Sequence, residues 1–243
     1  METKHQKIEA LDEFLSLQWG NFFSSETAKN IIENLDKIDK RIYALYMLQV
    51  YHWSSQSARS LGIAGANQHN KDIRFMMHCF EHAEEETGHE IMALNDVKAV
   101  GVPINDESDI PPPLAETEVL IAYVKHLATC KKPIRMLGYD YWTEKPYEHI
   151  GPFVRMTGNS FNLSEKQMTF YISHEEIDKK HGKDIERVLV QLCKTEEDWE
   201  DITEVAKTTL NLTFEMIGGI VKEYEKLLNG EKSKYEILNK IIN

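Results

Sequence analysis

The segment from Tyr171 to Lys183 constrains the fold of this chain more than any other part of the sequence. Read as an α-helix, it places His174, Asp178 and His181 at spacings of four and three residues, so that all three project from one face. Two imidazoles and a carboxylate on one stripe form a ligand set that suits iron, manganese or zinc. The segment therefore predicts a helix that carries part of a metal site, and other helices must bring matching ligands.

Helical periodicity runs through nearly all of the remaining chain. Apolar residues recur three and four positions apart, and no stretch alternates between apolar and polar residues as a strand would. Besides the helix of His174, the expected helices span about residues 6–19, 24–35, 39–66, 72–100, 114–130, 134–155 and 195–229, with an interruption near Pro146 or Gly151. The chain is therefore predicted to be all-α, with seven to eight helices. Composition does not change across the proline-rich loop at 101–113, so residues 1–243 are expected to form one domain.

Two capping boxes mark expected helix starts. Ser164 and Gln167 precede the helix of His174, and Thr195 and Asp198 precede the last long helix. In such a pair the first side chain accepts a backbone N–H of the first turn, and the second side chain reaches back. Both helices are therefore predicted to begin at these residues.

Composition narrows the class of protein. The net charge of −12 over 243 residues argues against nucleic acid or an anionic membrane as a partner. The three cysteines have no CxxC spacing and read as reduced thiols of a cytoplasmic protein. The N-terminus enters a charged amphipathic stretch rather than a secretory signal, and no window reaches the ~18 consecutive apolar residues of a membrane span.

A second group of candidate ligands lies in the helix expected over residues 72–100. His82, Glu85, Glu86 and His89 occupy positions i, i+3, i+4 and i+7, which share one helix face. The spacing Glu86-x-x-His89 is the one used in four-helix, carboxylate-bridged metal sites, and Asp178-x-x-His181 is its counterpart with a shorter acid. A run of glutamates is more often a solvated helix face, but two histidines one heptad apart favour a metal site.

A third group of ligands is needed, and Glu144 is the best candidate. It stands among aromatic residues just before the expected helix break, where a carboxylate is either exposed to solvent or buried and paired with a cation. Asp140, one turn earlier, is its competitor. The three segments together would supply enough nitrogen and oxygen ligands for two metal ions.

The residues quoted above resemble those of the iron-containing redox enzymes of the haem-oxygenase-like fold, over about residues 40–190. The resemblance is carried by the segment from His82 to Gly101, by His174, Asp178 and His181, and by Glu144 in its aromatic context. It implies a helical bundle related to thiaminase-type and coenzyme-PQQ-synthesis proteins. It also implies a non-haem di-iron site, or a mixed Mn/Fe site, that activates O2 and acts on a small amino-acid-like or fatty-acid-like molecule.

The resemblance implies two irons per chain, with manganese as an option in one site, and it assigns these as ligands: His82, Glu86, His89, Glu144, His174, Asp178 and His181. Some members have a glutamate seven residues before the histidine, where this chain has His82, and others have it three residues before, where Glu86 stands. Whether Glu85, Glu86 or His82 completes the site is left open. His174 and His181 lie ~10 Å apart along an ideal helix, so they are expected to serve different metals unless the helix bends between them.

Tyr139 and Tyr171 are the candidate catalytic residues, because aromatic side chains beside such a site can line the substrate pocket or donate electrons. The expected partners are a small-molecule substrate, O2 and an external reductant, and the long helices are compatible with a homodimer. A ferritin-like site is disfavoured because the helix expected over residues 39–66 contains no glutamate. A cofactor-free thiaminase-like or PQQ-synthesis-like enzyme or binding protein of the same fold is the alternative.

Overall fold

The structure, a computed structural model, describes residues 3–34 and 37–241, and all of their side chains except those of Tyr147, Glu148, Glu176, Asp178, Lys179 and Lys180. Over these residues it contains helices and no strand, so the all-α prediction is confirmed. Its α-helices are α1 (Lys4–Phe23), α2 (Glu26–Glu33), α3 (Arg41–Gly65), α4 (Ile73–Glu86), α5 (His89–Ala99), α6 (Ala115–Thr129), α7 (Met136–Thr143), α8 (Tyr147–Ser160), α9 (Thr169–Leu192) and α10 (Glu196–Leu228).

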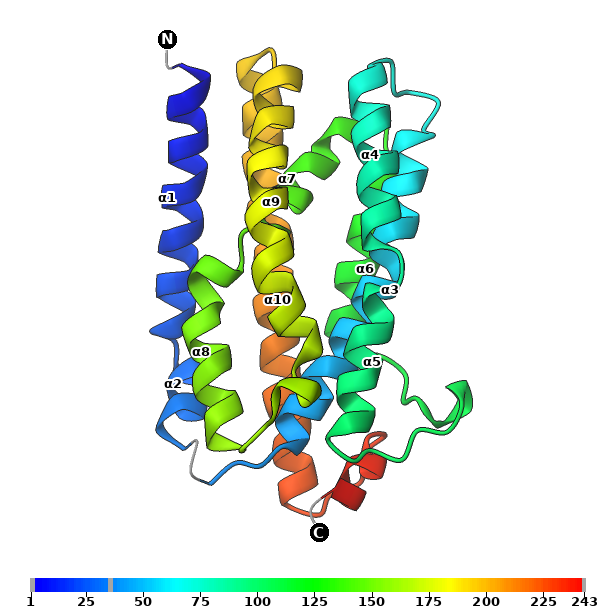
Figure 1. Ribbon diagram of the computed structural model, residues 1–243. Helices are drawn as coiled ribbons and strands as arrows, with labels where there is room; N and C mark the ends of the chain where they lie inside the picture. The colour runs from blue at the N-terminus through cyan, green and yellow to red at the C-terminus, as the bar shows by residue number, and fades with distance from the viewer. Residues whose placement is uncertain (1–2, 35–36, 242–243) are drawn as a thin grey trace.

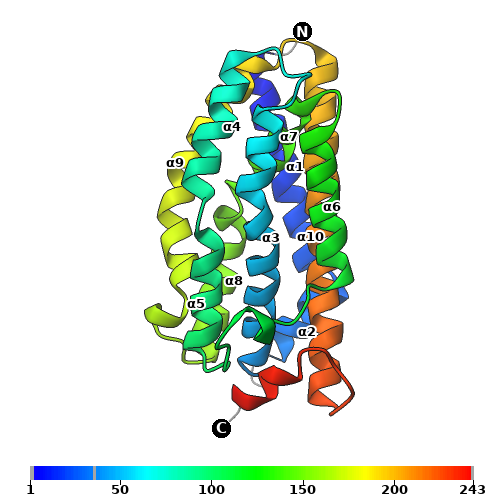
Figure 2. The same ribbon diagram turned by 90° about the vertical axis from the view of Figure 1, so that its right-hand side faces the viewer.

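The long helices run side by side along one axis of an elongated bundle (Figure 1). α3 lies between α4 and α5 on one side and α6 on the other (Figure 2). The short α7 crosses the inside of the bundle and packs mainly against α10. None of the described helices is both long and apolar enough to cross a membrane.

The prediction of a single helix over residues 72–100 is wrong, because the structure divides this segment into α4 and α5. Thr87 has an extended backbone, and Gly88 has a φ of 99°, in the left-handed region that glycine adopts without steric cost. The two helices remain end to end against α3 (Figure 2). As a consequence, Glu86 is the last residue of α4 and His89 is the first residue of α5.

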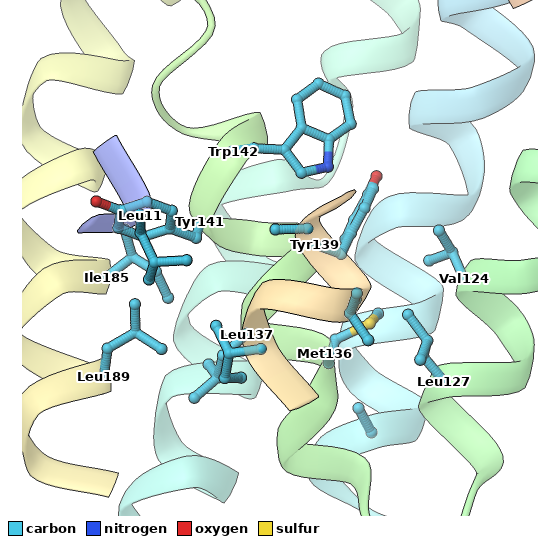
Figure 3. Packing of buried hydrophobic residues seen from close by; sticks show 14 of the residues in the cluster. Leu11, Val124, Leu127, Met136, Leu137, Tyr139, Tyr141, Trp142, Ile185 and Leu189 are labelled. Carbon is cyan, nitrogen blue, oxygen red and sulfur yellow. The ribbon is translucent and has the colours of Figure 1, made fainter. Parts of the chain in front are cut away.

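The expected interruption near Pro146 is confirmed, since α7 ends at Thr143 and α8 begins at Tyr147. α7 approaches α10 closely because it carries Gly138: a Cβ added there would lie 2.3 Å from the carbonyl oxygen of Ile202. Around this contact the side chains of α7 pack in different directions (Figure 3). Met136 faces Val124 and Leu127 of α6, and Tyr141 points the opposite way. This packing sets the position of Glu144, which follows the last residue of α7.

The two capping boxes form, with different results. Thr195 and Asp198 cap α10, which begins at Glu196 as predicted. Ser164 and Gln167 cap a short 3-10 turn, Glu165–Gln167, and α9 begins only at Thr169. The start of α9 is instead capped by Asp96 of α5, whose carboxylate accepts the backbone N–H groups of Thr169 and Phe170. A side chain from another helix has therefore taken over the role of the local cap.

Candidate metal centre

Ionisable side chains gather inside the bundle where α4, α5, α7 and α9 meet. Each of the following is less than a tenth exposed: His82, His89, Glu144, His174 and His181. Such a concentration of buried charge and imidazole is unfavourable unless the groups pair with one another or bind a metal. The sequence brings them here because α4 and α5 together present one side to α9, and α7 ends between them.

One group forms around the carboxylate of Glu144. Its Oε1 lies 3.0 Å from His82 Nε2, and its Oε2 lies 2.9 Å from His181 Nδ1. The other nitrogen of His181, Nε2, lies 3.1 Å from Glu85 Oε2, although the Glu85 side chain is 43% exposed. Ligand atoms of His82, Glu86, Glu144 and His181 all fall within 4.8 Å of one another. These four residues can therefore converge on one ion.

A second group forms around His89. Its Nδ1 lies 3.2 Å from Glu86 Oε1 and 3.0 Å from His174 Nε2. A backbone contact orients the ring of His174: its Nδ1 lies 2.6 Å from the carbonyl oxygen of Phe170. Because a carbonyl oxygen can only accept, Nδ1 carries the proton and Nε2 presents its lone pair. Glu86 Oε1 is also 3.8 Å from His82 Nε2, so the Glu86 carboxylate lies between the two groups.

The donor set fits the metal that the resemblance implies. Donor atoms bound to one ion at about 2.1 Å lie roughly 3 to 4 Å apart, which matches the separations above. Imidazole nitrogens and carboxylate oxygens are ligands that iron and manganese accept. His82 Nδ1 is buried without a hydrogen bond, and His82 Nε2 lies 3.0 Å from Glu144 Oε1. Ligands of a common ion approach each other as closely as this imidazole and this carboxylate do.

The pKa values show how these groups are balanced in the metal-free protein. Burial would raise the pKa of Glu144, but its contacts with His181 and His82 hold it at about 2. Burial would lower the pKa of His82, but the Glu144 carboxylate raises it to about 10. For His174, burial and then the nearby His89 both lower the pKa. Protonated His82 thus supplies the positive charge that a bound cation would supply, and His174 stays neutral.

The structure brings six of the seven expected ligands together in these two groups, and the seventh, Asp178, has a side chain outside the described residues. As their separation along α9 predicts, His174 and His181 face different groups. Asp140, the competitor of Glu144, is buried but faces His78 instead, with its Oδ2 3.5 Å from His78 Nε2. Sequence reasoning missed His78, although its spacing of four residues from His82 on one helix was a usable signal.

An elongated apolar cavity of about 190 Å³ adjoins the two groups, and His82, Glu86, Glu144 and His174 form part of its wall. α3 lines it from Ile42 to Leu61, a length of roughly 28 Å in an α-helix. One end of α3 contacts α5, where Tyr43 reaches Asp96, and the other end packs on α4, where Gly65 meets Cys79. The ligands of α4 and α5 lie between these two contacts and therefore face the middle of α3. The cavity therefore continues for roughly 15 to 20 Å from the ligands towards Ile42.

The two candidate catalytic tyrosines both line this cavity. Tyr139 accepts a hydrogen bond from Trp53 Nε1 at 2.6 Å, and its hydroxyl lies 3.2 Å from that of Ser57. Burial raises the pKa of Tyr139, so its phenol stays protonated. Tyr171 stacks on Tyr46 with ring centroids 6.2 Å apart. Both rings are thus held in place beside the buried ligands.

Comparisons with known proteins agree with this geometry. A family model described as "iron-containing redox enzyme" matches residues 44–214. Among solved structures, the chain is similar to the crystal structure of a domain of unknown function with a heme oxygenase-like fold from Shewanella denitrificans. The two are 30% identical, the match covers 93% of this chain and 97% of that one, and the TM-score is 0.86. A comparison with curated proteins finds no match.

Proposed function

Because this chain belongs to the family of iron-containing redox enzymes, we propose that it is a non-haem di-iron oxidase or oxygenase that uses O2 to act on a small fatty-acid-like molecule. One observation carries the proposal: buried histidines and glutamates form part of the wall of an elongated apolar cavity. A resident metal at this wall would meet a substrate bound in the cavity. Manganese in place of one iron, an external reductant and a cytoplasmic location belong to the same proposal.

In this proposal Glu86, His89 and His174 hold one iron, and Glu144, His181 and His82 hold the other. Asp178 joins the second set on the strength of its spacing from His181 alone. The Glu86 carboxylate lies within 4 Å of both His82 and His89, so it would be available to either iron. Iron bound here would supply the electrons that reduce O2 and the oxidising power that breaks a substrate C–H or C–C bond.

The cavity favours a fatty-acid-like substrate over an amino-acid-like one. No lysine or arginine is among the described residues that line it, and the protonated His82 in its wall is already paired with Glu144. A free carboxylate or a zwitterion therefore finds no unpaired cation there in the metal-free protein. A single carboxylate head group can be neutralised only at the metal positions. The length beyond the ligands accommodates an extended chain on the order of a dozen carbon atoms. Tyr139 and Tyr171 would contact such a chain next to the ligands.

The protein walls also keep water from the reacting carbon. Trp53 stacks on Trp142 with centroids 6.0 Å apart, and Trp142 donates its indole N–H to Thr209 at 2.7 Å. These rigid aromatic side chains close one side of the cavity and satisfy their own polar atoms. An apolar, preorganised wall of this kind orients one methylene group of the substrate towards the ligands.

The cofactor-free alternative finds less support. It requires a reactive cysteine beside the substrate, Cys79 or Cys130, and no cysteine is among the described residues that line the cavity. Burial also raises the pKa of the Cys79 thiol. A thiol of this kind is a packing residue rather than a nucleophile. The redox proposal is therefore the better account of the site.

The test is anaerobic reconstitution with Fe(II), followed by metal analysis and stopped-flow absorbance on exposure to O2, with saturated fatty acids of graded length as substrates. We expect about two irons per chain, O2 consumption that depends on the fatty acid, and a shortened or oxidised product. His181→Ala should abolish turnover, whereas His126→Ala, which changes an exposed histidine of α6, should retain it. Stable iron binding without O2 consumption under any reductant would contradict a redox role.

A further inference from the structure

A third cluster of buried polar atoms lies beside the two groups described above, between α4 and α7. It consists of His78, His82 and Asp140, whose ligand atoms all fall within 4.8 Å of one another. Asp140 is 1% exposed, and the side chain of His78 is 12% exposed. The cluster is therefore almost closed to solvent, with His78 as its most accessible member.

Three atoms of this cluster have no hydrogen-bond partner among the described residues: His78 Nε2, His82 Nδ1 and Asp140 Oδ2. The other nitrogen of His82, Nε2, faces Glu144 Oε1 at 3.0 Å instead. A buried polar atom without a partner destabilises the fold, and native proteins contain few of them. His78 Nε2 and Asp140 Oδ2 lie 3.5 Å apart without forming a hydrogen bond. Several such atoms around one point indicate a ligand that satisfies all of them together.

The spacing of these residues matches that of a metal site. His78 and His82 are four residues apart on α4, so both imidazoles project from one face, and their ring centroids are 5.5 Å apart. Two histidines at this spacing on a helix are a recurrent metal-binding arrangement. Asp140 comes from α7 and completes a set of two histidines and one carboxylate, which leaves further coordination positions open.

We propose that His78, His82 and Asp140 form a third metal-binding site, for a divalent transition-metal ion. His82 belongs both to this site and to the group around Glu144. Its Nε2 faces Glu144 and its Nδ1 has no hydrogen-bond partner, so Nδ1 is the atom left for the third ion. An imidazole that binds one ion through each nitrogen must first release its N–H proton. The buried Asp140 carboxylate gains a cation, and the imidazole nitrogens gain an acceptor for their lone pairs. Metal binding at this site is argued from these three residues, and it does not depend on whether the protein has redox activity.

The test is X-ray diffraction from metal-free crystals soaked in Zn2+, with anomalous difference maps at the zinc edge. We expect a peak at about 2.1 Å from His78 Nε2 and from an oxygen of Asp140. That peak should vanish in His78→Ala and in Asp140→Asn, which keeps the size of the side chain, while peaks beside His89 and His174 remain. His126→Ala should keep every peak.

A solution measurement complements the maps. In a competition titration of Zn2+ against a chromophoric chelator, His78→Ala should weaken one binding step by at least tenfold, and His126→Ala should weaken none.

Circular dichroism and thermal unfolding of the metal-free variants check their folding, and if a variant does not fold, the wild-type map alone decides. A wild-type map with water in this cluster, and zinc only beside His89 and His174, would overturn the third site and leave the di-iron proposal standing. A peak at His78 alone would support the third site and contradict the di-iron proposal.

Discussion

The backbone N–H of Thr169 donates a hydrogen bond to Asp96 Oδ1 at 2.9 Å and thereby ties the first turn of α9 to α5. The same carboxylate accepts the Thr169 hydroxyl at 2.6 Å and the Phe170 N–H at 3.0 Å, and it lies 3.2 Å from the Tyr43 hydroxyl. Asp96 is fully buried. Because α5 carries His89 and α9 carries His174, this carboxylate holds together the two helices that bring these imidazoles within 3.0 Å.

Replacing Asp96 by alanine should therefore loosen both the fold and the metal group. Asp96→Ala leaves the N–H groups of Thr169 and Phe170 and the Thr169 hydroxyl without their acceptor, whereas the Tyr43 hydroxyl keeps the carbonyl oxygen of Gln167. We expect a loss on the order of 3 kcal/mol in the free energy of unfolding. We expect a lower Tm and weaker binding of the iron beside His89 and His174, measured by thermal denaturation and by Fe(II) titration. Asp106→Ala, at an exposed cap of a 3-10 turn, should change neither. Unaltered iron affinity in a destabilised Asp96 variant would limit this residue to a structural role.

Glu144 offers a test of the two metal positions. Its two oxygens face His82 and His181, whereas His89 and His174 lie in the other group. Glu144→Ala should therefore reduce the iron content after anaerobic reconstitution from about two per chain to about one. Metal analysis checks this, with Glu204→Ala on the exposed face of α10 as the control. A variant that still binds two irons would show that Glu144 is not a ligand.

The far end of the cavity should set the length of the substrate. Ile217 of α10 lines the cavity and lies two turns beyond Thr209, which contacts Trp142 near the ligands. Ile217→Trp should fill part of this end and shift the preferred fatty acid to one shorter by several carbons. The measurement is the dependence of kcat/KM, or of binding by calorimetry, on chain length. Ile63→Trp, at a position 46% exposed, is the matched control and should keep the wild-type profile.

Lys145 stabilises the contact of α1 with the site. Its ammonium lies 2.6 Å from both Asp12 Oδ1 and Glu186 Oε1, and it is only 9% exposed. Lys145→Met would remove the cation that the two carboxylates share. Both carboxylates are more than a third exposed and remain hydrated, so we expect a loss on the order of 1 kcal/mol in the free energy of unfolding. Urea denaturation measures it. Lys183→Met, on the exposed side of α9, should have little effect, and equal stability of the two variants would refute this role.

The cap of α10 predicts a pH dependence. Burial would raise the pKa of Asp198, but backbone N–H groups of Lys194 and Thr195 outweigh it and hold the pKa at about 2, below the ordinary value of 3.8. A carboxylate with a lowered pKa stabilises the fold above pH 3.8 and loses that contribution as the pH falls towards 2. The difference in unfolding free energy between wild type and Asp198→Asn should therefore shrink from pH 5 to pH 2 in urea titrations. A constant difference over this range would contradict the lowered pKa.

Sequence reasoning succeeded for structural features that depend on residues close together in the chain. Helical periodicity identified most of the helices, and Thr195 marked the start of α10, because an amphipathic stripe and a capping side chain act within a few residues. The spacing of His174 and His181 also follows from helix geometry alone. The division at Gly88 was not predicted. The sequence shows only that a glycine stands there, and whether a glycine interrupts a helix depends on what packs against it.

The tertiary structure decided which ligands meet. The approach of Gly138 to Ile202 places α7 so that Glu144 faces His82 and His181 while Asp140 faces His78, and no local pattern encodes that rotation. Capping of α9 by Asp96 likewise joins residues far apart in the chain. The sequence by itself determined most of the helices and the candidate metal chemistry, because both follow from interactions within a few turns. The pairing of imidazoles with carboxylates, and the apolar cavity beside them, came only from long-range packing of the bundle.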